Sequence, residues 1–181
     1  FTAKAVAALR SRTEEIADEL LTGLAAKREV DLMDDYASML PATVIAEMLG
    51  APVAMSRQFL AWGAEAARSL DAGLSFGDFR RSERGLRALQ RWMEGHFAHL
   101  RTHPGDNILS TLVHAHAAEG KLTQDELSAT AMLLLAAGFE TTVNLIGNGT
   151  ALLVEHPDQR ERLQAEPALW TSVGLRHTGP P

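Results

Sequence analysis

The strongest constraint on the fold is a long helical segment in the second half of the chain. Thr123 followed by Glu126 fits a capping box, in which each side chain satisfies a free backbone N–H of the first helical turn. His156 and Pro157 give the next stop signal. The sequence therefore predicts one helix over about 123–155, roughly nine turns at 3.6 residues each.

Most of the remaining sequence also has helical periodicity. Residues 80–102, for example, repeat apolar side chains at three and four positions, whereas Asp31 to Tyr36 forms a polar break and Asp71 to Asp78 a glycine-containing loop. No segment has a convincing strand pattern. We predict an all-α fold for the given residues, organised as a single domain.

Composition and charge exclude several classes of function. The chain of 181 residues has a formal charge of −6 and no basic tract typical of a nucleic-acid-binding protein. Its longest apolar run, Ala131 to Phe139, is too short to span a membrane. The first residues, 1–4, lack the pattern of a signal peptide. We expect a cytoplasmic protein that binds neither nucleic acid nor membrane.

The middle of the predicted long helix has an unusual composition. Spacings of three and four residues place Leu134, Ala137, Gly138 and Thr141 on one face, and Glu140 lies beside Thr141. Gly138 costs about 1 kcal/mol relative to Ala in a helix interior. The small residues could leave a groove for a flat ligand, and Thr141 could bend the helix by bonding back to a carbonyl. The alternative is a crossing point with another helix.

Two stretches of sequence carry a resemblance to a known family. Ala137-Gly138-Phe139-Glu140-Thr141-Thr142 resembles the signature of the central helix of the cytochrome P450 superfamily, Ala/Gly-Gly-x-Asp/Glu-Thr-Thr/Ser. Residues 40–52, Leu-Pro-Ala-Thr-Val-Ile-Ala-Glu-Met-Leu-Gly-Ala-Pro, are similar to a stretch common in bacterial members. The resemblance extends over nearly the whole chain and implies the helical part of the cytochrome P450 fold.

The resemblance implies a haem-dependent monooxygenase that oxidises a small organic substrate with O₂. It implies that haem lies against Leu134, Ala137, Gly138 and Thr141. Thr141 is then expected to hydrogen-bond oxygen or its water at the iron, and Glu140 to help relay protons. The implied electron donor is a ferredoxin or flavodoxin.

The sequence also departs from the family pattern. The family's iron ligand is a cysteine thiolate, and this chain has no cysteine. In the family's Glu-x-x-Arg element, Arg176 matches the arginine, but Val173 stands in place of the glutamate. We therefore expect residues 1–181 to be part of one domain that lacks an N-terminal portion and the haem-ligand region. Such a piece is not expected to be active alone, and the alternative is a non-catalytic helical scaffold or binding module.

Two further clusters have simpler interpretations. His96, His99 and His103 share a helix face at spacings of three and four, so they could bind zinc, although polar side chains also suit the end of a helix. We favour the second interpretation and expect no metal site in this chain. The charged run 80–84 is most simply a solvated helix start, but it could also contact an acidic redox partner.

Overall fold

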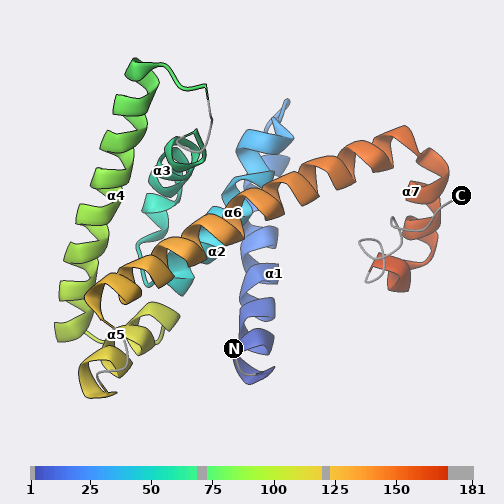
Figure 1. Cartoon of the computed structure of the whole chain (residues 1–181). Coiled ribbons are helices and arrows are strands. Elements are labelled where there is room, and N and C mark those ends of the chain that lie inside the picture. The colour runs from blue at the N-terminus through green and yellow to red at the C-terminus, as the bar shows by residue number, and fades with distance from the viewer. Residues whose placement is uncertain (1–2, 69–72, 120–122, 171–181) are drawn as a thin grey trace, which may run out of the picture. The chain divides into compact units, whose positions relative to one another are not determined.

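Helices make up nearly all the regular structure in the computed structural model, which describes residues 3–68, 73–119 and 123–170 (Figure 1). Within these ranges no strand occurs, which confirms the predicted all-α class. The elements are α1 (Ala3–Ala25), the π-helix η1 (Leu32–Ala37), α2 (Met39–Met48), the 3₁₀-helix η2 (Val53–Met55), α3 (Ser56–Arg68), α4 (Phe76–Thr102), α5 (Ile108–Glu119), α6 (Gln124–Glu155) and α7 (Pro157–Ala165).

The chain divides into two compact units, Phe1–Val143 and Asn144–Pro181. The second unit contains the last turns of α6 and the short helix α7. Pro157 occupies the first turn of α7, where its missing N–H has no helical partner to lose. Leu163 is the buried residue of α7.

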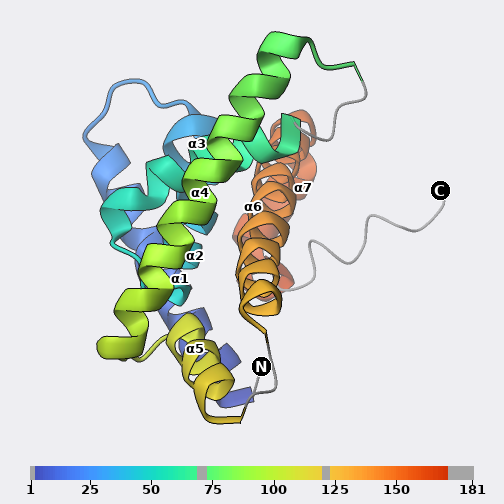
Figure 2. The same cartoon turned by 60° about the vertical axis from the view of Figure 1, so that its left-hand side comes forward.

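The core of the first unit joins five of its helices. In this unit α3 lies along α4, as both views show (Figures 1 and 2), and α2 packs on α3. Phe59 lies edge-on to Trp92 with ring centroids 5.0 Å apart, a favourable aromatic geometry. The buried cluster contains Ile45, Leu49, Phe59, Trp62, Leu89, Met93, Phe97, Leu100, Leu109, Val113, Leu127, Ala131 and Leu135, among others.

The segment predicted as a polar break is helical instead. Asp31 caps η1 because its carboxylate accepts hydrogen bonds from the backbone N–H groups of Met33 (2.8 Å) and Asp34 (3.0 Å). The acidic residues that suggested a loop are thus the residues that stabilise the start of a short helix, where carboxylates are favourable.

Helix α4 begins earlier than the sequence predicted. Ser75 is its N-cap, and the Ser75 hydroxyl accepts a hydrogen bond from the Asp78 N–H at 3.2 Å. Part of the loop predicted for residues 71–78 therefore belongs to the first turn of α4. Phe76 and Gly77 obscured this start, since neither is a strong helix former at an exposed position.

Gly50 ends α2 in a left-handed conformation with a φ of 66°. Its N–H donates to the Glu47 carbonyl at 2.9 Å, and the Ala51 N–H donates to the Ala46 carbonyl at 2.8 Å. This is the Schellman arrangement, which satisfies the last carbonyls of a helix. A Cβ atom at Gly50 would overlap the Asn107 amide group, so both the backbone and the packing require glycine here.

The capping box predicted for the long helix is confirmed. The Thr123 N–H donates to Glu126 Oε2 at 2.7 Å, and the Glu126 N–H donates to Thr123 Oγ1 at 3.2 Å. Helix α6 then runs from Gln124 to Glu155, in agreement with the predicted 123–155. Two hydrogen bonds from Thr123 lower the pKa of the Glu126 carboxyl. The larger effect comes from the backbone N–H of Thr123 and the smaller from its hydroxyl.

This lowered pKa predicts a specific dependence of stability on pH. The Glu126 carboxylate stabilises the folded state above the pKa it has in the unfolded chain, and this contribution is lost as pH falls through the lower folded-state pKa. Denaturant unfolding at several pH values should therefore show that Glu126→Gln destabilises the protein near neutral pH and ceases to do so in acid. Asp125→Asn removes an equal charge next to it without touching the capping box. An identical pH profile for both variants would contradict the prediction.

Candidate functional site

Helix α6 has one side in the core and another side exposed. Leu127, Ala131 and Leu135 are buried, and Phe139 packs against the same core. Leu133, in contrast, is 67% exposed although it lies in the middle of the helix. An apolar helix with an exposed apolar side is a surface that soluble proteins usually cover with a ligand or a partner.

The predicted site residues lie on or beside this exposed side. Gly138, Glu140 and Thr141 are exposed, and Leu134 is half-buried. The backbone of Ala137 lies in α6, but its side chain is outside the described residues. Helix α6 is α-helical throughout this stretch, so the three- and four-residue spacings align the site residues as the sequence predicted. The bend proposed at Thr141 stays a prediction.

Gly138 also lies where α6 comes close to α2. A Cβ atom built on Gly138 would lie 3.1 Å from Ile45 Cδ1, and one built on Gly63 of α3 would lie 3.6 Å from the Phe139 ring. The missing side chain of Gly138 therefore leaves room for the Ile45 side chain, as the crossing-point interpretation expected. Sequence reasoning missed Ile45 as a neighbour, because a contact across 93 positions has no local signal.

Glu140 and Thr141 give this exposed side its polar groups. A threonine hydroxyl can donate one hydrogen bond and accept others, and a carboxylate accepts hydrogen bonds and can exchange protons with solvent. Elsewhere in α6, Thr130 Oγ1 donates to the Glu126 carbonyl at 2.7 Å and Thr150 Oγ1 to the Ile146 carbonyl at 2.8 Å. The pair at 140–141 combines a hydroxyl and an acid next to small and apolar residues.

The histidines of α4 have structural contacts. His96 Nε2 lies 2.8 Å from the Leu49 carbonyl, so the ring donates a hydrogen bond to the end of α2. The His99 and His103 rings stack with centroids 4.6 Å apart. Across the described ranges, no group of three or more histidine, aspartate or glutamate side chains is placed to hold a metal ion. Arg176 and Val173 lie outside the described residues.

The length and composition of α6 decide what can cover it. Asp125–Glu155 contains an 18-residue window apolar enough for a membrane span, with a mean hydropathy of 1.5, and 12% of that window is buried. A single such helix is weak support for a membrane protein, because core helices of soluble proteins have the same composition. A flat and largely apolar ligand, such as haem, is another kind of cover for this side. A haem of the cytochrome P450 type also needs a cysteine thiolate as its iron ligand. These 181 residues contain no cysteine and supply no such ligand.

Comparison with known proteins identifies the family. The sequence profile of the family described as Cytochrome P450 matches residues 83–168. The chain is 42% identical over 174 residues to the vitamin D(3) 25-hydroxylase of Pseudonocardia autotrophica, with 96% of this chain and 41% of the relative covered. It is 37% identical over 187 residues to the 6-deoxyerythronolide B hydroxylase of Saccharopolyspora erythraea, covering 100% of this chain and 45% of the relative.

A solved structure agrees with this result. The myxobacterial cytochrome P450 CYP267B1, crystallised with myristic acid, superposes with a TM-score of 0.88 at 35% identity. The match covers 96% of this chain and 42% of that protein. The chain thus spans less than half the length of the relatives it matches. The sequence profile, the relatives and the helical architecture together show that the chain belongs to the cytochrome P450 family.

Proposed function

We propose that these residues form one wall of the haem pocket in a monooxygenase that hydroxylates a small organic substrate with O₂. The observation that carries the proposal is the exposed side of α6, where small and apolar residues adjoin Thr141 and Glu140. The two relatives named as hydroxylases support the reaction class. Electrons come from a ferredoxin or flavodoxin, the donor that bacterial family resemblance implies.

Leu134, Ala137 and Gly138 bind and orient the haem. Their short or apolar side chains let a flat ligand approach the backbone of α6 and keep water from that face. When bound, haem supplies the iron chemistry that activates O₂, and the protein contributes position and protons. No cysteine occurs among these 181 residues, so the thiolate ligand comes from elsewhere in the complete protein.

Thr141 and Glu140 move the protons. Thr141 Oγ1 donates a hydrogen bond to the reacting oxygen and accepts one from a water or acid behind it. The Glu140 carboxylate is exposed and one residue away, so it can collect protons from solvent and pass them toward Thr141 Oγ1. The two side chains thus form a proton relay from solvent to the reacting oxygen, and α6 holds both of them.

The rest of the protein completes this arrangement. We place residues 1–181 within one larger haem-binding domain in a cytoplasmic enzyme, with Arg176 in the family's Glu-x-x-Arg element. The exposed apolar side of α6 is then explained by haem rather than by a membrane. The alternative function, a non-catalytic scaffold, predicts that no haem binds to this side of α6.

Haem content tests the proposal directly. Ala137→Leu fills the surface proposed for haem, so the complete protein carrying this substitution should contain less haem per chain, measured by visible absorbance. Ala129→Leu makes the same change at another exposed position of α6 and should leave haem content unaltered. Equal haem content in both variants would show that haem does not lie on this part of α6, and a wild-type protein without haem would favour the scaffold.

A further inference from the structure

Four arginines form a row along the outer side of α4. Arg80, Arg84, Arg87 and Arg91 follow one another at spacings of four, three and four residues, which places them on one helix face. All four are exposed. The buried residues of α4 lie on the other side of the helix and are Ser82, Leu89, Met93, Phe97 and Leu100. We call these four arginines the arginine row.

The row has the opposite charge to the chain as a whole. Residues 80–91 contain five arginines and one glutamate, whereas the chain has 23 acidic and 17 basic residues and a net charge of −6. The row extends over about 16 Å, at 1.5 Å per residue. Successive arginines of the row are only three or four residues apart, about 4.5–6 Å along the helix axis, which is less than the screening length of about 8 Å at physiological salt, so their charges add to a common positive field.

Contacts within α4 do not bury these charges. The Arg87–Glu83 ion pair is 2.6 Å long, yet the Arg87 side chain is 70% exposed. Arg84 and Arg91 each bond through Nε to the carbonyl one turn earlier, at 3.1 and 3.3 Å. These bonds fix the direction of the side chains, and each guanidinium has two terminal nitrogens that can bind a carboxylate as a fork.

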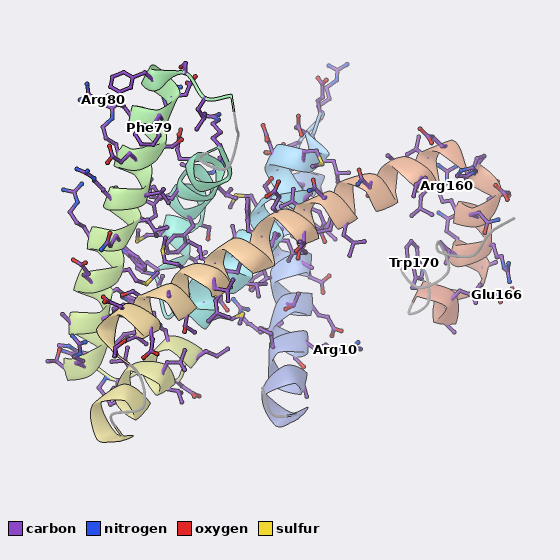
Figure 3. All side chains as sticks on the ribbon, in the orientation of Figure 1. Arg10, Phe79, Arg80, Arg160, Glu166 and Trp170 are labelled. Atoms are coloured by element: carbon purple, nitrogen blue, oxygen red, sulfur yellow. The ribbon has the colours of Figure 1, made fainter. Side chains whose placement is uncertain are left out.

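Exposed aromatic rings adjoin one end of the row. Phe76 is 76% exposed and Phe79 is 52% exposed. The guanidinium carbon of Arg80 lies 6.0 Å from the centre of the Phe76 ring. Figure 3 shows Phe79 and Arg80 at the N-terminal end of α4. Arginine and aromatic residues together are typical of the energetic centres of protein interfaces.

We propose that the arginine row, with Phe76 at its end, is a docking surface for an acidic protein partner. A short run of carboxylates on a partner helix matches the row in length, charge and geometry. Long polyanions and anionic bilayers fit less well, because they extend past the row onto the rest of the chain, which is acidic and repels them. The proposal is independent of haem binding at α6.

A helical peptide provides the probe. The peptide is alanine-based and helical, and it carries four glutamates at three- and four-residue spacing, which extend over about 16 Å like the row. Its binding to the full chain is measured by fluorescence anisotropy, beside a matched peptide with glutamine in place of glutamate. The protein variant is Arg84→Gln/Arg87→Gln/Arg91→Gln. The control variant, Arg10→Gln/Arg28→Gln/Arg57→Gln, loses three exposed arginines elsewhere.

The row predicts a clear difference between the two variants. The row variant should bind the acidic peptide about tenfold more weakly, since three exposed charge pairs are lost, whereas the control variant should bind like the wild type. Glutamine retains helix propensity, so α4 should stay folded in the row variant, as circular dichroism will verify. Equal weakening in both variants would overturn the proposal. So would row-dependent binding to anionic vesicles or duplex DNA that is tighter than binding to the peptide.

Discussion

Thr141→Ala in the complete, haem-loaded protein should separate electron consumption from product formation. Removing Thr141 Oγ1 takes away the hydroxyl proposed to deliver a proton to the reacting oxygen, while the apolar surface of α6 remains. General acid–base contributions of this kind are worth about 10²-fold in rate or more. Product formation should therefore fall by about 10²-fold, with electrons diverted to reduced oxygen species. The measurement is product per electron supplied, with a ferredoxin system as donor.

Three companion variants make this experiment specific. Thr141→Ser keeps a hydroxyl and should restore much of the coupling. Thr142→Ala removes the hydroxyl of the next residue, which lies on a different side of α6 and is half-buried, and should retain the wild-type ratio. Glu140→Gln should slow product formation without the full loss of coupling, since water can still reach Thr141. An unchanged ratio of product to electrons in Thr141→Ala would show that the hydroxyl has no role in proton delivery.

The sequence predicted helix ends well where they are stabilised by interactions between residues close together in the chain. The capping box at Thr123 and Glu126 and the stop at Pro157 depend on side chains within one or two turns, so their positions follow from sequence spacing. The prediction of a polar break from Asp31 was wrong, because the same polar residues can end one helix or cap the next. Only the position of the chain around Asp31 shows that its carboxylate faces the N–H groups of Met33 and Asp34.

In the candidate site, too, the sequence predicted the features that depend on local spacing and missed those that depend on tertiary contacts. Periodicity placed Gly138 and Thr141 on a common helix face, and the structure leaves both exposed. The approach of Ile45 to Gly138 is a tertiary contact, set by how α2 and α6 meet, and no pattern within either helix encodes it. The sequence also could not assign the exposed side of α6 to haem by periodicity alone, because a small-residue crossing point gives the same spacing. The family motif favours haem, and this assignment stays a prediction.

The largest effect on folding is expected at Gly50. Gly50→Ala forces a residue with a side chain to adopt a φ of 66°, which costs about 1–2 kcal/mol. The new Cβ also overlaps the Asn107 amide group. Asn107 Oδ1 accepts a hydrogen bond from the Ser110 N–H at 2.8 Å at the start of α5, and losing such a cap costs about 1 kcal/mol. We expect the free energy of unfolding to fall by about 2–3 kcal/mol in total.

A matched glycine and a double-mutant cycle separate the two causes. Gly23→Ala makes the same chemical change within α1, where a new Cβ meets nothing within 4 Å, so helix propensity should make it neutral or stabilising by about 1 kcal/mol. In an Asn107→Ala background, Gly50→Ala should cost only the backbone term, because the overlapping amide is gone. Denaturant unfolding of the four proteins in the cycle measures the coupling. If Gly50→Ala cost the same in both backgrounds, the left-handed backbone alone would require glycine, and the fit between the end of α2 and the start of α5 would contribute nothing.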